Sequence, residues 1–264
     1  IYLDNLNNKF FLRTLDRISF SDTGFVIISK SGNTLEVVSQ FLILTDIFEK
    51  ELGFKKLSDH FLSITMDRNS ILHSISKKKN IRIIEHDKDI SGRFSILSCV
   101  GWVPSYISGV DFEEIIRGAQ YEYSIFGKNY SKPIVGSAMM SNLAKDNISV
   151  SVIATYEPRL LVFCDWYRQL WSESLGKNGR GMVSTVSLLP VDQHSQLQAW
   201  IDGPRDKVIN IILNEEKELD NPINSSMIDS AEFLHGKTLG DVLRASAKAT
   251  IQTLKDSGRP VRVI

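Results

Sequence analysis

The sequence is poor in cysteine, carries no excess of charge of either sign and has no long apolar run. Its two cysteines, Cys99 and Cys164, lack CxxC spacing and lie in apolar stretches, which argues against a disulfide framework or a zinc site. Lys plus Arg and Asp plus Glu number 31 each, so no net field favours nucleic acid or an anionic membrane. No apolar run approaches the roughly 18 residues of a transmembrane helix. We therefore expect a soluble protein of a reducing cytoplasm.

Two nucleotide-binding motifs are also absent, namely Gly-x-x-x-x-Gly-Lys-Ser/Thr and Gly-x-Gly-x-x-Gly. In their place an apolar strand runs into a hydroxyl-rich loop, residues 29–34, and then into apolar residues at helical spacing, with Asn33 and Glu36 placed like a capping box. This order builds an anion site at a helix N-terminus, where N–H groups and the helix dipole converge. The side chains expected at the anion are Ser29, Lys30, Ser31 and Thr34.

The composition of this loop favours a small monophosphate as the ligand rather than a nucleotide. Hydroxyl and amide side chains are dense in it, more so than a helix cap alone requires. The alternative is a well-capped helix start that binds nothing.

Short β-rich runs alternate with helical stretches, a pattern typical of an α/β fold with mainly parallel sheets. A helical middle, roughly 94–145, separates two strand-rich halves, so two open sheets with sites at the carboxyl ends of their strands are the simplest architecture. The expected strands are 2–4, 25–29, 61–65, 81–85, 150–154, 160–163, 183–188, 208–213 and 261–264. The clearest expected helices are 34–52, 166–175, 193–201 and 239–256, the last with Thr238 and Asp241 as a capping pair.

Three further polar clusters follow expected strands. Residues 89–95 follow 81–85, a helix with Gln169 and Glu173 follows 160–163, and residues 192–195 follow 183–188. All three are expected at the carboxyl rim of a sheet, the usual place of a site in an α/β fold.

Glu173 is the candidate base. It stands four residues after Gln169, so both side chains point to the same side of one helix. A carboxylate that borders an apolar stripe is partly desolvated, which raises its pKa and improves it as a base near neutral pH. The alternative is an ordinary surface Glu beside the core.

His194 and Arg93 are the other two candidates for chemistry. His194 is expected in the first turn of a helix capped by Asp192, where the dipole favours a neutral ring that can pass protons; the alternative is a half-buried structural His. Arg93 follows Gly92 in a turn, and its permanent charge suits a developing oxyanion. The alternative for Arg93 is a salt bridge to a nearby Asp.

A phosphate site, a carboxylate base, an arginine and a neutral histidine are the groups needed to move a proton between adjacent carbons of a sugar phosphate through an enediol. No metal motif or redox cofactor signature accompanies them. Four ordered segments resemble the motifs of the phosphoglucose isomerase family, and the resemblance spans essentially the whole chain. They are residues 29–34, 89–101, 169–177 and 192–198.

The resemblance implies interconversion of glucose 6-phosphate and fructose 6-phosphate, a cytoplasmic step of glycolysis and gluconeogenesis, without metal or organic cofactor. It implies that Glu173 moves the proton between C1 and C2 and that His194, supplied across a homodimer interface, helps to open the sugar ring. It also implies that Gly92 and Arg93 border the enediolate and that Gln169 lines the sugar site. The residues it assigns to the phosphate are Ser29, Lys30, Ser31 and Thr34.

The same resemblance implies two doubly wound, flavodoxin-like sugar-isomerase domains of three layers, α/β/α. We expect the first over residues 1–100 and the second, with a helical linker, over 101–264. The family usually has Gly-Gly-Arg where this chain has Ser91 before Gly92, which fits only if that position does not need positive φ. The family's glycine-rich segment and catalytic lysine are not found, so a central fragment is expected.

Two alternatives for the function stay open. Sugar-isomerase domains also occur as sensors, so a sugar-phosphate-binding regulatory module is the first; it needs the phosphate site but has no use for Glu173, Arg93 and His194 together. Another aldose–ketose sugar-phosphate isomerase is the second, because a phosphate site does not report which sugar carries the phosphate.

Overall fold

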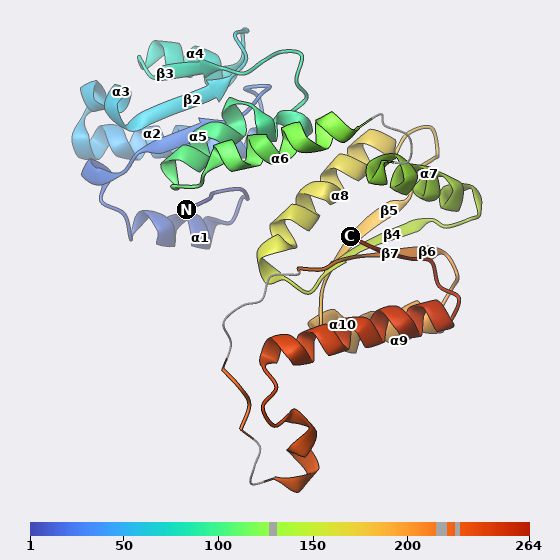
Figure 1. Cartoon of the computed structure of the whole chain (residues 1–264). Helices are drawn as coiled ribbons and strands as arrows, with labels where there is room; N and C mark the ends of the chain where they lie inside the picture. Colours follow the sequence, from blue (N-terminus) through green and yellow to red (C-terminus); the bar gives the residue numbers. More distant parts are fainter. Residues whose placement is uncertain (127–130, 215–220, 225–227) are drawn as a thin grey trace. The chain divides into compact units, whose positions relative to one another are not determined.

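The computed structural model of the chain describes residues 1–126, 131–214, 221–224 and 228–264. The backbone forms two compact units, Ile1–Ser124 and Ile125–Ile264 (Figure 1). Helices between residues 99 and 124 group with the first unit, so this division falls later than the expected boundary after residue 100. Each unit has its own parallel sheet, which confirms the predicted α/β class. Within the described residues, no helix is long and apolar enough to cross a membrane.

The first unit is built on a three-stranded parallel sheet in the order β1-β2-β3, with Ile28 opposite Ile64 and Ile64 opposite Ile84. Its strands are β1 (Phe25–Ile28), β2 (Phe61–Thr65) and β3 (Arg82–Glu85). Its helices are α1 (Asn8–Leu15), α2 (Leu35–Leu52), α3 (Leu57–His60), α4 (Ile71–Lys78), α5 (Cys99–Ile107) and α6 (Phe112–Ile125), with 3-10 turns η1 (Phe20–Asp22), η2 (Phe54–Lys56) and η3 (Gly92–Leu97).

An aromatic cluster fixes α2 on this sheet. Phe41, Leu44 and Phe48 recur at helical spacing and are buried on one face of α2. The ring of Phe48 meets the ring of Phe61 on β2 edge to face, with 5.3 Å between centroids. Because α2 is held here, its first turn lies at the carboxyl end of β1, where residues 29–34 join the two elements.

The second unit is built on a four-stranded parallel sheet in the order β5-β4-β6-β7. The chain moves from β4 to β5 on one side and then to β6 on the other, so the winding reverses between β4 and β6. The strands are β4 (Val150–Thr155), β5 (Val183–Leu188), β6 (Lys207–Ile212) and β7 (Val261–Val263). The helices are α7 (Lys132–Lys145), α8 (Leu161–Leu175), α9 (Val191–Ile201) and α10 (Leu239–Asp256), with 3-10 turns η4 (Pro158–Leu160) and η5 (Asp229–Leu234).

Helices cover both faces of this second sheet, with α9 and α10 on one side and α7 and α8 on the other (Figure 1). Alternate residues of β4 serve the two faces. Val152 and Ala154 pack with Leu254 of α10, whereas Ile153 packs with Cys164 of α8. The three layers α/β/α expected from the sequence are therefore present in this unit.

Two of the expected strands are wrong. Residues 2–4 form no strand, and residues 160–163 end the turn η4 and begin helix α8. The Glu157 side chain accepts a hydrogen bond from the Arg159 backbone N–H at 2.9 Å and so starts η4, and Cys164 is buried from a helix. The apolar run at 160–163 is too short for its periodicity to distinguish a strand from the first turn of a helix.

Gly101 packs α5 closely against η3, the turn that carries Arg93. A Cβ on Gly101 would stand 1.9 Å from the carbonyl oxygen of Ile96, which is backbone and cannot rotate away. We expect Gly101→Ala to lower the free energy of unfolding by about 1–3 kcal/mol, the usual cost of an overpacked site. The shift of the urea midpoint at an unchanged m-value measures this loss.

Gly118→Ala is the matched control. Gly118 lies exposed in α6 and a Cβ there would meet no atom within 4 Å, so the change should stabilise the protein by roughly 0.5–1 kcal/mol. Equal stability of the two variants would contradict the close contact at Gly101.

Candidate functional site

The segment after β1, residues 29–34, is called the β1 loop. It turns tightly on itself: the Gly32 N–H donates to the carbonyl and the hydroxyl of Ser29, both at 3.1 Å. The hydroxyls of Ser29 and Thr34 are 2.8 Å apart, and Ser29 is buried. Gly32 has φ +65°, a left-handed conformation that suits glycine. The predicted hydroxyl-rich loop at the start of a helix is therefore present.

The segment after β2, residues 66–70, is called the β2 loop, and it holds the β1 loop from one side. The Met66 N–H donates to the Lys30 carbonyl at 3.2 Å, and the Leu72 N–H donates to the Gly32 carbonyl at 2.9 Å. A Cβ on Gly32 would stand 2.1 Å from the Ser70 hydroxyl. Only glycine therefore fits between these two loops.

The predicted capping box at the start of α2 is wrong. The amide oxygen of Asn33 accepts a hydrogen bond from the Ile71 N–H at 3.0 Å, and this contact draws it to α4 instead. Thr34 is the N-cap residue of α2 and makes no capping hydrogen bond through its side chain. The first turn of α2 thus keeps backbone N–H groups that no such cap satisfies, which is the condition for holding an anion.

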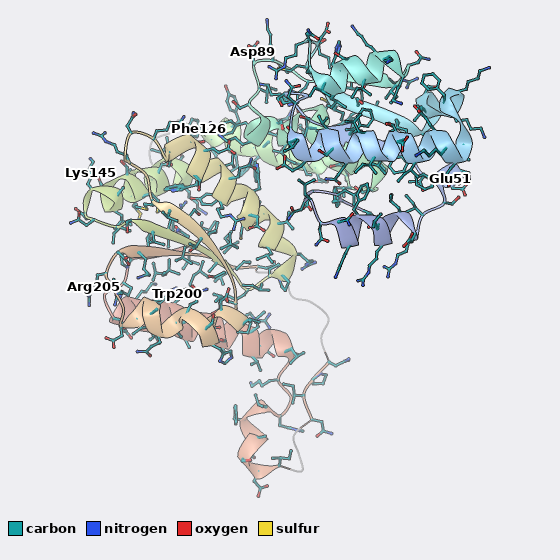
Figure 2. All side chains as sticks on the ribbon, turned by 180° about the vertical axis from the view of Figure 1, so that it is seen from behind. Glu51, Asp89, Phe126, Lys145, Trp200 and Arg205 are labelled. Atoms are coloured by element: carbon teal, nitrogen blue, oxygen red, sulfur yellow. The ribbon has the colours of Figure 1, made fainter. Side chains whose placement is uncertain are left out.

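The segment after β3, residues 86–91, is called the β3 loop, and Lys30 ties it to the β1 loop. The Lys30 ammonium donates to the carbonyls of Lys88 and Ile90 at 2.8 and 2.5 Å. The sequence predicts that Lys30 aims its charge at a phosphate, but its hydrogen bonds go to the β3 loop. Figure 2 shows Asp89 of that loop and Glu51 of α2 at opposite ends of the unit, as expected if the loops share one rim.

Gly92 and Arg93 follow the β3 loop and begin η3. Ser91 has φ −62°, so the serine found where the family usually has glycine causes no backbone strain. The Ser95 hydroxyl donates to the Gly92 carbonyl at 2.5 Å and fixes the turn. The Arg93 guanidinium lies over the Phe94 ring, 4.8 Å from its centroid, and its side chain is half-buried. The first unit thus brings the β1 loop and the Arg93 turn together at one rim.

Gln169 and Glu173 share one face of α8, as predicted. The Gln169 amide donates to the Glu173 carboxylate at 3.0 Å, which orients the candidate base. Both residues are exposed, so the partial burial expected for Glu173 is wrong for this chain. Cys164, near the start of α8, is buried, and Trp171 near its end packs against Met182 and Val208, whereas Glu173 lies on the exposed side of the helix.

Glu173 lies at the amino edge of the second sheet rather than at the predicted carboxyl rim. Helix α8 starts after β4 and runs back against the strand direction, and the Trp171 indole N–H donates to the carbonyl of Met182, just before β5, at 3.0 Å. The prediction that all three polar clusters share the carboxyl rim is therefore wrong for Glu173. Only the start of a helix that follows a parallel strand lies at that rim, and Glu173 is near the end of α8.

His194 lies at the opposite, carboxyl edge, in the first turn of α9. Asp192 does not cap this helix, whose N-cap residue is Pro190; its carboxylate accepts the Leu188 N–H at 2.8 Å and joins α9 to the end of β5. His194 is exposed, not half-buried. Measured along the strand direction, Glu173 and His194 are therefore separated by the length of β5, which is six residues or about 20 Å.

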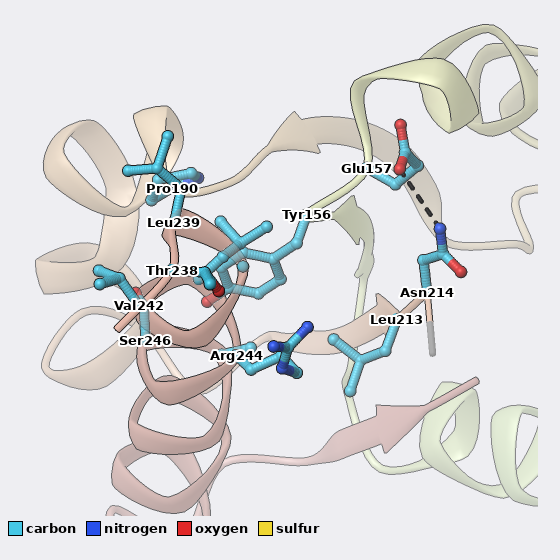
Figure 3. Close-up of a pocket in the computed structure, with 13 residues that line it drawn as sticks. Tyr156, Glu157, Pro190, Leu213, Asn214, Thr238, Leu239, Val242, Arg244 and Ser246 are labelled. Carbon is cyan, nitrogen blue, oxygen red and sulfur yellow. Dashed lines mark hydrogen bonds between the residues drawn. The ribbon is translucent and has the colours of Figure 1, made fainter. Parts of the chain in front are cut away.

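Two features of the structure were not predicted from the sequence. One is Arg68 in the β2 loop, whose guanidinium donates to the Ser31 carbonyl. Residues 67–70 form a polar run directly after a buried strand, and this pattern could have indicated Arg68 as a candidate. The other is a pocket of about 640 Å³ in the second unit, at the carboxyl ends of β4 and β6 beside α10 (Figure 3).

None of the predicted site residues of this unit lines the pocket. Glu157 at its edge accepts a hydrogen bond from the Asn214 amide at 3.4 Å. Hydrogen bonds from Arg159 lower the pKa of Glu157 to about 2. Burial raises the pKa of Tyr156, although the nearby Thr250 and Ser246 hydroxyls oppose this. Among the described residues, no group of three or more His, Cys, Asp or Glu could hold a metal ion.

Comparison with known proteins gives a consistent result. Residues 1–189 match the family described as Phosphoglucose isomerase. The chain is 32% identical over 262 residues to a probable glucose-6-phosphate isomerase of Haloarcula marismortui, covering 98% of this chain and 59% of the relative. It is also 32% identical to glucose-6-phosphate isomerase of Methanocaldococcus jannaschii, covering 98% and 64% respectively. The chain thus spans about three fifths of the length of these relatives.

Solved structures agree with the fold. A hypothetical protein from Thermus thermophilus superposes with a TM-score of 0.90 at 28% identity, covering 100% of this chain and 65% of that one. A glucose-6-phosphate isomerase from Chlamydia trachomatis superposes with a TM-score of 0.74 at 22% identity, covering 96% and 49%, which concerns the fold alone. Because the family match extends over well more than half of the residues, the chain belongs to the phosphoglucose isomerase family.

Proposed function

We propose that this chain forms part of a glucose-6-phosphate isomerase, which interconverts glucose 6-phosphate and fructose 6-phosphate by ring opening and proton transfer through a cis-enediol. The observation that carries the proposal is the β1 loop, a hydroxyl-rich turn at the uncapped start of α2, in a member of this family. The names of the relatives support the same reaction. Two free cysteines support a reducing, cytoplasmic setting.

The β1 loop holds the phosphate in this proposal. Backbone N–H groups of the first turn of α2 and the positive end of its dipole face the anion, and the hydroxyls of Ser29, Ser31 and Thr34 add donors. Ser29 and Thr34 already share a hydrogen bond, so little reorganisation is needed on binding. Lys30 contributes by fixing the loop to the β3 loop through two carbonyls.

Glu173 moves the proton. Its carboxylate takes the proton from C2 of the open-chain aldose and returns it to C1, while the C1 oxygen gains a proton and the C2 oxygen loses one. The hydrogen bond from Gln169 holds the carboxylate in place for both steps. Arg93 stabilises the negative charge on the enediolate oxygens, a contribution that grows as the charge develops. His194 passes the proton needed to open the sugar ring.

The positions of these groups support a homodimer. Glu173 and His194 lie at opposite edges of one sheet, so a single copy of the second unit cannot bring them to one sugar. A two-fold dimer in which each copy gives His194 to the site of the other resolves this separation.

Glu173→Gln tests the base. We expect the kcat for fructose 6-phosphate conversion to fall at least about 100-fold, because an amide cannot accept the proton, with substrate affinity nearly unchanged. A coupled assay measures turnover, and isothermal titration calorimetry measures affinity. Asp165→Asn on the same helix, which removes only an exposed pair with Arg168, is the control and should keep full turnover. The assay should be run on this chain and on a longer chain that contains it.

Equal losses of turnover and affinity in Glu173→Gln would contradict the assignment of the base. A protein that binds fructose 6-phosphate but never converts it, as this chain and within a longer one, would instead fit a sugar-phosphate-binding regulatory module.

Mixing two inactive variants tests the dimer. Glu173→Gln and His194→Ala should each be inactive alone, yet a mixed dimer has one site with both native side chains. Random exchange of equal amounts should therefore restore about a quarter of the native activity. The measurement is turnover after the two variants are mixed and allowed to exchange subunits, with Asp165→Asn plus Glu173→Gln as the control mixture.

The control mixture separates complementation from dilution. It should show about half of the native activity, since only its Glu173-containing chains work. No recovery in the first mixture, despite proven subunit exchange, would place Glu173 and His194 in the same chain's site.

A further inference from the structure

The β2 loop presents a cation to the backbone of the β1 loop. The Arg68 Nε and Nη2 atoms donate to the Ser31 carbonyl at 3.1 and 2.7 Å. Arg68 is exposed to solvent. It lies outside the four segments that resemble motifs of the family. Hydrogen bonds from a charged donor are about twice as strong as neutral ones, so this contact is a strong restraint on one peptide group.

The restrained peptide group joins Ser31 to Gly32, and its orientation determines the turn of the β1 loop. In a planar trans peptide the carbonyl and the N–H point in opposite directions, so the Ser31 carbonyl and the Gly32 N–H are set together. With the carbonyl held by Arg68, the Gly32 N–H is left to donate to Ser29. A glycine can adopt many backbone conformations, and Arg68 restricts this one to the turn that the β1 loop needs.

Arg68 also brings a positive charge to the β1 loop, in addition to that of Lys30. The Lys30 ammonium is engaged by two carbonyls of the β3 loop. Arg68 uses Nε and Nη2 on Ser31, and its Nη1 has no hydrogen-bond partner among the described residues. The neighbouring acid, Asp67, pairs with His73 at 2.9 Å and with Lys77 at 4.0 Å, and it forms no salt bridge with Arg68.

The β2 loop itself is well anchored, which makes Arg68 a defined restraint and not a mobile surface group. The pair between Asp67 and the buried His73 joins the loop to α4. The Ser70 N–H donates to the Arg68 carbonyl at 2.8 Å, and the Ser70 hydroxyl accepts the His73 N–H at 3.3 Å. The backbone that carries Arg68 is therefore fixed on both sides of it.

We propose that Arg68 is a positioning residue for phosphate: it holds the Ser31 carbonyl so that the β1 loop is formed before the ligand arrives, and it places a positive charge beside the bound dianion. This inference rests on the proposed phosphate role of the β1 loop. It assigns Arg68 to recognition of the phosphate and gives it no part in the proton transfer.

The experiment compares Arg68→Ala and Arg68→Lys with Arg82→Ala. Arg82 is an exposed arginine of β3 at the other end of the strands, so its variant removes the same charge without touching the β1 loop. Binding of inorganic phosphate is measured by isothermal titration calorimetry, and KM and kcat for fructose 6-phosphate by the coupled assay. Thermal melting shows that each variant is folded.

We expect Arg68→Ala to bind phosphate roughly 10- to 100-fold more weakly and to raise KM by a similar factor, the range for losing hydrogen bonds from a charged donor. Its kcat should stay within about threefold of the native value. Arg68→Lys should lie in between, because one ammonium cannot reproduce two directed donors. Millimolar guanidinium ion should restore part of the phosphate affinity of Arg68→Ala and leave Arg82→Ala unchanged.

Three results would overturn the inference. They are phosphate binding by Arg68→Ala within twofold of the native protein, the same loss in Arg82→Ala, and a fall in kcat with KM unchanged. The calorimetry does not require turnover, so the two proposals can fail separately. If the native protein binds phosphate but does not isomerise the sugar, either as this chain or within a longer one, and Arg68→Ala loses the binding, the result supports Arg68 and contradicts the isomerase. A native protein that binds no phosphate contradicts the role of Arg68.

Discussion

The candidate site depends on one backbone constraint, the left-handed Gly32 pressed between two loops. At φ +65° and with a would-be Cβ 2.1 Å from the Ser70 hydroxyl, this position admits no side chain. The hydrogen bonds that surround it join the carboxyl ends of adjacent parallel strands, where Ile28 stands opposite Ile64. The geometry of the β1 loop is therefore inherited from the register of the sheet. A loop made in this way has already lost its conformational freedom during folding, so an anion that binds to it does not have to order it.

Strand direction is the second constraint, and it decides which groups can meet within one chain. In a parallel sheet every strand ends at the same edge, so the β1 loop, the β2 loop and the Arg93 turn gather there. A helix that follows such a strand returns to the other edge, which is where the end of α8 carries Glu173. His194, at the start of the next helix, stays at the carboxyl edge. Topology thus sorts residues at helix starts and residues at helix ends to opposite edges of the sheet, and this separation is the reason for proposing that two copies share one site.

Much of the fold could be predicted because its signals are local. The strands at 61–65 and 183–188 and the helix at 239–256 were predicted with the bounds that the structure has. The helix is marked by its own neighbours: the Asp241 N–H donates to the Thr238 hydroxyl at 3.1 Å, and the Asp241 carboxylate accepts the Thr238 N–H at 3.0 Å. The cap expected from Asn33 failed for a non-local reason. A backbone N–H that lies 38 residues further along the chain competes for the same oxygen and takes it.

The same distinction between local and non-local interactions decides which parts of the candidate site could be predicted. Strand, loop and helix are contiguous, so the hydroxyls of the β1 loop could be recognised from the order of residues alone. The burial of Glu173 depends on which residues pack against the end of α8, and this could not be predicted from the sequence. The spacing along a helix shows only which side chains share a face. Arg68 meets Ser31 across 37 residues of sequence, and only the pairing of β1 with β2 brings them together. A cation that supports a loop of this kind is therefore best sought after the neighbouring parallel strand, because that is the nearest backbone at the same edge.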